Sequence, residues 1–174
     1  SFNLNDEHSY LKDSLGTPIL SRGFFELYHD NCLAQIRQSL RLYLHFCLIW
    51  NSPYLWVSFD RLGIKTPSGE SSMGLDLHVD QNPNVHPDFT TVQGVLALED
   101  CPVERGTFAV VPGSRHSFKK YSQFIKPGYI GEFVPLEDSD LQKELLSQKQ
   151  LIPLRKNCIV TWDSRTTHAN SSNI

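Results

Sequence analysis

Short runs of β-branched and aromatic residues, each bounded by turn-forming Pro, Gly or Asn, recur along most of this sequence. Such runs predict β-strands, and several at regular spacing predict a sandwich or barrel rather than alternating βαβ units. The expected strands are residues 54–60, 75–80, 91–99, 106–111 and 158–162, and a further one begins at His168. We therefore expect a mainly β fold, a cupin-like jelly roll with flanking α-helices.

One helix is expected before these strands. Asp30 or Asn31 is a suitable N-cap, and apolar residues follow from Leu33 at helical spacing. The end of this helix is ambiguous, because every even-numbered residue from 40 to 50 is apolar, which a strand would also produce. We favour a helix to about His45.

A second helix is expected late in the chain. Asp138 or Ser139 caps it, it ends near Gln148, and its expected buried stripe is Leu141, Leu145 and Leu146. No linker or repeat divides the 174 residues, so we expect one domain over 1–174. Within it, residues 1–50 form a helical and loop support, and residues 54–174 form the jelly-roll core.

Charge and composition exclude several classes of partner. The formal net charge is −3 and no polybasic stretch is present, so we expect neither nucleic acid nor a membrane as a partner. The apolar run over residues 42–50 is too short to span a bilayer, and the N-terminal residues lack a signal-peptide pattern, so we expect a cytoplasmic protein. Four widely spaced cysteines argue against a zinc site or disulfides and predict buried thiols.

The segment His78-Val79-Asp80 carries the clearest chemistry. Side chains alternate along a strand, so His78 and Asp80 point to the same face. With the distal His168 they supply two imidazoles and one carboxylate, the facial triad of non-heme Fe(II), which leaves positions open for O2 and a co-substrate. On spacing alone, a hydrogen-bonded surface pair is equally acceptable, and the same donors also suit Mn, Ni or Zn.

Two further segments support the metal hypothesis: residues 105–116 (RGTFAVVPGSRH) and residues 162–170 (WDSRTTHAN). With His78-Val79-Asp80, they resemble in order the His-x-Asp motif, the strand ending in Pro-Gly-Ser-His (here with one inserted Arg) and the distal-His segment of the phytanoyl-CoA dioxygenase family. The resemblance covers roughly residues 54–174. It implies a double-stranded β-helix that binds Fe(II) through His78, Asp80 and His168.

The same resemblance implies a reaction. A small-molecule substrate is hydroxylated with O2, while 2-oxoglutarate is oxidatively decarboxylated to succinate and CO2. Asp80 agrees with hydroxylation, because relatives that halogenate lack this carboxylate. The alternative is a cupin-like metal-binding module without 2-oxoglutarate turnover.

The family pattern also includes an Arg, beyond the distal His, that pairs with the far carboxylate of 2-oxoglutarate. No Arg follows His168, so either the strand continues past Ile174 or the co-substrate site is altered. Arg165 would face the opposite side of an extended strand, which predicts a structural or rim position. The candidate co-substrate contacts are Asn170, which has the parity of His168, and the cations Arg61 and Lys65.

The substrate entrance is expected in three loops, residues 63–73, 81–90 and 119–131. Two histidines in or near these loops are expected to have other roles: His86 is an exposed loop residue, and His116 stabilises a turn.

Overall fold

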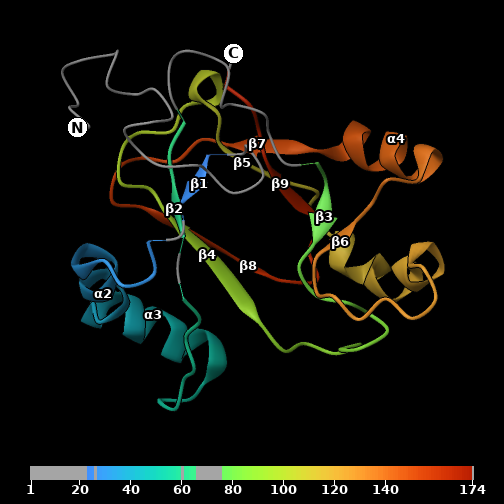
Figure 1. Cartoon of the computed structure of the whole chain (residues 1–174). Helices are drawn as coiled ribbons and strands as arrows, with labels where there is room; N and C mark the ends of the chain where they lie inside the picture. The colour runs from blue at the N-terminus through green and yellow to red at the C-terminus, as the bar shows by residue number, and fades with distance from the viewer. Residues whose placement is uncertain (1–22, 26, 60, 66–75, 174) are drawn as a thin grey trace. The chain divides into compact units, whose positions relative to one another are not determined.

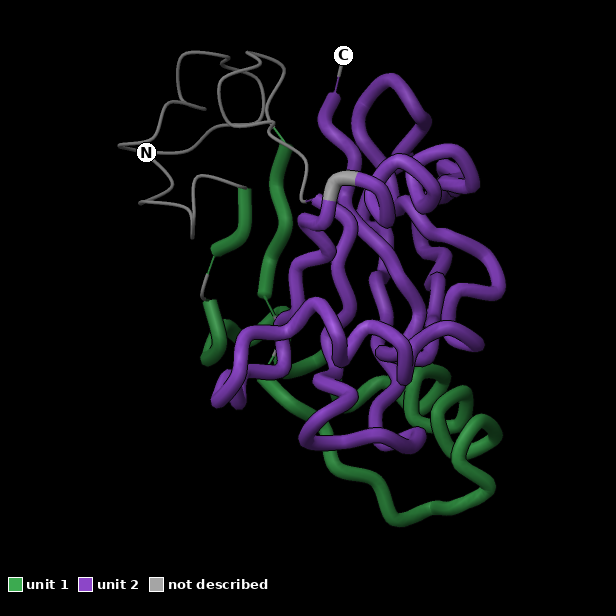
Figure 2. Tube along the Cα trace, turned by 90° about the vertical axis from the view of Figure 1, so that its right-hand side faces the viewer, with its two compact units in different colours: residues 1–66 green, residues 67–174 purple. Residues whose placement is uncertain are grey.

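The computed structural model describes residues 23–25, 27–59, 61–65 and 76–173 (Figure 1). The chain divides into two compact units, residues 1–66 and 67–174, which Figure 2 colours separately. The single domain expected over residues 1–174 stays a prediction. None of the helices in the described part has the length and apolar character of a membrane span.

The described part of the first unit contains two helices and a small ribbon. Its elements are β1 (Phe24–Phe25), α2 (Asn31–Arg37), α3 (Leu40–Trp50) and β2 (Leu62–Gly63), with β1 and β2 antiparallel. The Asp30 carboxylate accepts a hydrogen bond from the Cys32 backbone N–H at 2.7 Å, which confirms Asp30 as the N-cap of α2.

Two expectations for this unit are wrong. The single helix to His45 is instead broken at Gln38 and Ser39 and continues to Trp50, where Asn51 adopts a left-handed conformation at φ 49° and ends it. The strand expected over residues 54–60 is absent from residues 54–59, which have no regular structure. A strand needs a paired neighbour as well as β-forming residues, and the described residues provide none here.

The second unit contains two antiparallel sheets, as expected of a jelly roll. Five strands are ordered β6 (Val134–Pro135), β3 (His78–Val79), β9 (His168–Asn170), β5 (Phe108–Val110) and β7 (Gln150–Ile152). The other sheet pairs β4 (Val92–Leu96) with β8 (Ile159–Asp163). The predicted strands at 75–80, 91–99, 106–111 and 158–162 correspond to β3, β4, β5 and β8, and β9 begins at His168 as predicted. The short strands β6 and β7 were not predicted.

The five-stranded sheet has two chemically different faces. Because side chains alternate, Val79, Ala109 and Ala169 share one face while His78 and His168 share the other. On the apolar face the three small residues pack into a core with side chains from a 3₁₀ helix, η3 (Ser114–Phe124), and from α4 (Ser139–Gln148). In Figure 1, α4 and the yellow η3 lie together on one side of β3 and β6, and β4 and β8 lie on the other.

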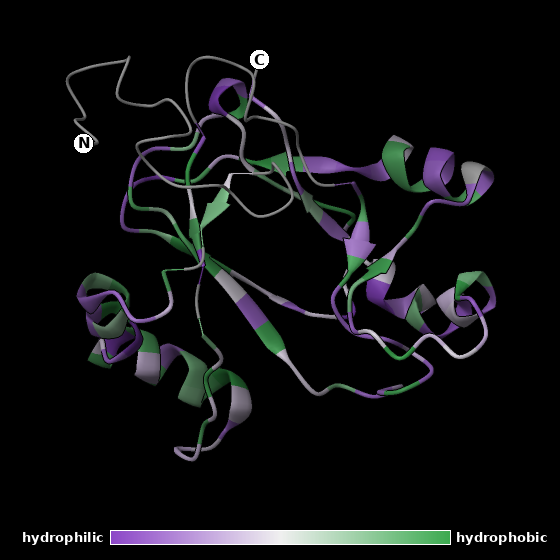
Figure 3. Ribbon diagram, viewed as in Figure 1, coloured by the Kyte–Doolittle hydropathy of each residue, from purple (hydrophilic) through white to green (hydrophobic). Residues whose placement is uncertain are grey.

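The late helix and the segment before it agree with the sequence-based predictions in part. Asp138 caps α4, accepting hydrogen bonds from two backbone N–H groups at 3.2 and 3.0 Å, as predicted. Leu145 is buried, but Leu146 is exposed, so that part of the expected stripe is wrong. Residues 119–124 belong to η3 rather than a loop, because burial of Phe118 and Tyr121 holds the segment against the core. Figure 3 shows both helices with hydrophobic and hydrophilic residues interspersed.

The cysteines do not follow the expected burial. Cys32 and Cys158 are exposed, and Cys47 and Cys101 are only partly buried. The expectation of buried thiols is therefore wrong.

Candidate metal centre

Three potential metal ligands converge on the polar face of the five-stranded sheet. His78 on β3 and His168 on β9 are direct cross-strand partners. Asp80 follows β3, two residues after His78, so its side chain points to the same face as that of His78. Oδ2 of Asp80 lies 3.7 Å from Nε2 of His78 and 3.3 Å from Nε2 of His168. One ligand atom from each residue lies within 4.8 Å of the others. The structure thus brings together the three residues that the sequence singled out.

Both imidazoles are held in the orientation that metal binding requires. Nδ1 of His78 lies 2.7 Å from the carbonyl oxygen of Asp76, and Nδ1 of His168 lies 2.9 Å from that of Thr166. A carbonyl can only accept, so each Nδ1 carries the proton and donates it. The lone pair of each Nε2 therefore faces the cluster, as in most histidine metal sites.

Asp80 is prepared to act as an anionic ligand. Burial opposes its ionisation, but His168 and His78, when protonated, outweigh this through hydrogen bonds from Nε2–H and through their charge, and they hold the pKa of the carboxyl well below its usual range. A bound metal would take the place of these two Nε2 protons. Nε2 of Gln93, on β4, also donates to Oδ2 of Asp80 at 2.7 Å. Gln93 thus orients the carboxylate from the second sheet. No residue spacing predicts this contact, because Gln93 lies 13 residues from Asp80 and on another sheet.

Aromatic rings surround the cluster. The ring of Phe133 lies 4.7 Å from that of His78, and the ring of Trp162, on β8, lies 4.8 Å from that of His168. Phe108 packs against Trp162 at 4.4 Å. Phe133 is 42% exposed, so it forms an outer edge of the site, while the His78 and His168 side chains are almost fully buried. These rings limit the access of water to the donor atoms.

Two buried amides directly after Asp80 fix the loops beside the centre. Gln81 donates to the carbonyls of His86 and Asp88 and accepts from Thr90 and Ser164. Asn82 is completely buried and donates to the carbonyls of Tyr129 and Gly131 at 3.2 and 3.0 Å. Sequence reasoning missed both. Their polar character and position in a turn-rich segment suggested only an irregular loop.

The structure gives different surroundings to the residues that the sequence suggested as co-substrate contacts or as a rim residue. Arg165 forms hydrogen bonds of 2.6 to 3.1 Å with both carboxylate oxygens of Asp163, which confirms a structural position. Burial opposes ionisation of Asp163, but these hydrogen bonds lower its pKa below the usual value. Asn170 shares the face of His168 on β9. Arg61 and Lys65 belong to the first unit.

Two further histidines singled out in the sequence, His86 and His116, do not belong to the cluster. His86 is half exposed and forms an ion pair with Glu132 at 3.2 Å, and His116 is exposed. The expectation that His86 is an exposed loop residue is confirmed, and the turn-stabilising role of the His116 side chain stays a prediction.

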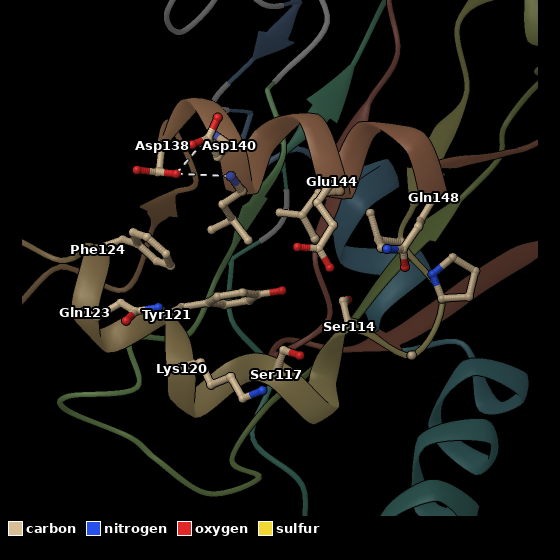
Figure 4. Close-up of a pocket in the computed structure, with 15 residues that line it drawn as sticks. Ser114, Ser117, Lys120, Tyr121, Gln123, Phe124, Asp138, Asp140, Glu144 and Gln148 are labelled. Carbon is tan, nitrogen blue, oxygen red and sulfur yellow. Dashed lines mark hydrogen bonds between the residues drawn. The ribbon is translucent and has the colours of Figure 1, made fainter.

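A separate cleft of about 500 Å³ lies between η3 and α4 (Figure 4). Because these helices pack on the apolar face of the five-stranded sheet, the cleft and the metal cluster lie on opposite faces. Its polar lining includes Ser117, Lys120, Tyr121, Asp140, Glu144 and Gln148.

The fold and the cluster together define a class: a jelly-roll protein with the two-histidine, one-carboxylate donor set of non-heme iron oxygenases. The model of the phytanoyl-CoA dioxygenase (PhyH) family matches residues 26–174, and the chain belongs to that family. No curated protein matches the sequence.

One solved structure agrees with this fold. The structure of EctD from S. alaskensis with 2-oxoglutarate and 5-hydroxyectoine has a TM-score of 0.63 at 17% identity, over 87% of this chain and 50% of that one. This chain therefore spans half the length of EctD. The epimerase SnoN, in complex with Fe3+, alpha ketoglutarate and nogalamycin RO, has a TM-score of 0.41 at 23% identity, over 59% of this chain and 37% of that one.

Proposed function

We propose that this chain is an Fe(II)- and 2-oxoglutarate-dependent dioxygenase that hydroxylates a small molecule. The observation that carries the proposal is the convergence of His78, Asp80 and His168, with both Nε2 lone pairs and an ionised carboxylate aimed at one point. Three protein donors suit ferrous iron and leave coordination positions for other ligands. Family membership and the EctD-like fold support the same reading.

Each residue has a defined part in this proposal. His78, Asp80 and His168 hold the metal, and Gln93 keeps the Asp80 carboxylate oriented. When bound, the metal with 2-oxoglutarate and O2 supplies the oxidation, in which one oxygen atom enters a substrate C–H bond and the other enters succinate as CO2 leaves. Phe108, Phe133 and Trp162 limit the entry of water.

Three residues are proposed as co-substrate contacts. Asn170 is proposed as a contact because it shares a face with His168. The cations Arg61 and Lys65 are proposed partners of the distal carboxylate of 2-oxoglutarate. Arg165 is not a candidate, because Asp163 already engages its guanidinium.

Anaerobic addition of Fe(II) and 2-oxoglutarate tests the proposal. We expect the weak visible charge-transfer band of the iron chelate, and on admission of O2 we expect 2-oxoglutarate decarboxylation. The variant Asp80→Ala should lose both, whereas Asp88→Ala, which removes an exposed carboxylate outside the cluster, should keep both. Iron binding without the band would favour the metal-binding module, and turnover by Asp80→Ala would show that the ligands are misassigned.

A further inference from the structure

Two buried polar atoms beside the metal centre lack a hydrogen-bond partner among the residues that the structure describes. They are the side-chain oxygen of Gln93, Oε1, and the indole nitrogen of Trp162, Nε1. Nearly all buried polar atoms in folded proteins have a partner, so an unpaired acceptor and an unpaired donor so close to a candidate active site need an explanation.

The orientation of the Gln93 amide is fixed by its neighbour. The Asp80 carboxylate can only accept, so the nitrogen of the amide must face it at 2.7 Å. Oε1 must then point elsewhere, and rotating the amide would bring two oxygens together. The unpaired acceptor is therefore a consequence of the contact that orients the metal ligand.

The two unpaired atoms belong to neighbouring side chains. Gln93 and Trp162 are direct partners in the register between β4 and β8, so their side chains share a face. That face is turned toward the metal centre, because Gln93 contacts Asp80 and the Trp162 ring lies 4.8 Å from that of His168. One acceptor and one donor are thus offered side by side next to the cluster.

The pairing of a donor with an acceptor restricts the ligand. A carboxylate can accept from the indole N–H but cannot donate to Oε1, and an ammonium can donate but cannot accept. A hydroxyl does both. We propose that Gln93 and Trp162 form a subsite that binds an uncharged hydroxyl group of the substrate beside the metal, an inference that rests on the proposed function.

Small probe molecules test this subsite in protein loaded with paramagnetic Mn(II). Two imidazoles and one carboxylate bind Mn(II) as they bind other first-row metals. The probes are 1-propanol and propylammonium, which do not compete with 2-oxoglutarate for the metal through a carboxylate, and the readout is broadening of their methyl proton resonances relative to Zn(II)-loaded protein. We expect 1-propanol to be broadened more. Trp162→Phe keeps the ring and removes only the N–H, so propanol affinity should fall about fivefold, the loss of one hydrogen bond.

A second variant and matched controls complete the experiment. Gln93→Met should weaken propanol binding to a similar extent, and it should also weaken Mn(II) binding about tenfold by releasing Asp80, as measured by the resonance of free Mn(II). Trp56→Phe in the first unit and Gln148→Met on α4 should change neither.

Three results would overturn the subsite: propylammonium binding as well as propanol, no propanol broadening in the unmodified protein, or unchanged propanol binding in Trp162→Phe, which would indicate that water occupies the position. These outcomes are distinct from failure of the proposed function. If the unmodified protein does not bind Mn(II), the metal centre itself is wrong, and the subsite falls with it.

Discussion

The metal centre and the cleft between η3 and α4 lie on opposite faces of one sheet, and their polar groups behave in opposite ways. At the metal centre the donors of His78, Asp80 and His168 point to one another. In the cleft, the acidic groups serve the helix that carries them: Asp138 caps α4, and Asp140 pairs with Lys143 at 3.6 Å. Convergence of donors distinguishes the candidate metal centre, whereas the cleft records how two helices pack.

The loop anchors of the metal centre give the largest expected effect on stability. Replacing Asn82 with Ala removes its hydrogen bonds to the carbonyls of Tyr129 and Gly131 and leaves both without this partner. We expect a loss of about 2–3 kcal/mol in the free energy of unfolding, measured by chemical denaturation. The control Asn84→Ala removes only a side chain and keeps the hydrogen bond that the backbone N–H of residue 84 donates to the Asn82 side chain. It should lower the free energy of unfolding by less than about 0.5 kcal/mol. Equal losses in the two variants would show that the buried anchor has no special role.

Tyr121 connects the two faces, and its loss should have an intermediate effect. Its phenol lies in the floor of the cleft and forms a 3.0 Å hydrogen bond with the Thr167 hydroxyl, next to His168. Tyr121→Phe should cost about 1 kcal/mol of stability. Iron affinity should be unchanged, because His168 is held separately by the Thr166 carbonyl. A tenfold fall in iron affinity would instead show that the cleft supports the metal centre.

The same substitution has a pH signature. Burial raises the pKa of the Tyr121 phenol, although its hydrogen bond with Thr167 opposes the rise. A group with a raised pKa in the folded state contributes stability that is complete below its unfolded pKa of about 10 and is lost as the pH rises above it. Denaturation between pH 9 and 11 should therefore show a steeper loss of stability for the unmodified protein than for Tyr121→Phe.

Sequence reasoning succeeded where local pattern decides structure. The alternation in His78-Val79-Asp80 predicted the shared face of two ligands. A hydrogen-bonding residue before an apolar pattern narrowed each helix cap to two adjacent residues, of which Asp30 and Asp138 are the caps. It failed where the local structure or contact depends on a partner that is distant in the sequence. No spacing predicts that Gln93 meets Asp80, since sheet pairing brings them together, and residues 54–59 have β-forming residues but no neighbouring strand.

Glu144 gives the smallest expected effect and the most direct test of the contrast between the two faces. Its carboxylate points from α4 into the cleft, toward Tyr121 (Figure 4). If the cleft is only a packing feature, Glu144→Gln should change the free energy of unfolding by less than about 0.5 kcal/mol and leave the iron and 2-oxoglutarate charge-transfer band intact. The band distinguishes this outcome from that of Asp80→Ala, which removes a carboxylate from the other face. Loss of the band in Glu144→Gln would mean that the cleft takes part in the chemistry, and convergence of donors would no longer suffice to locate the site.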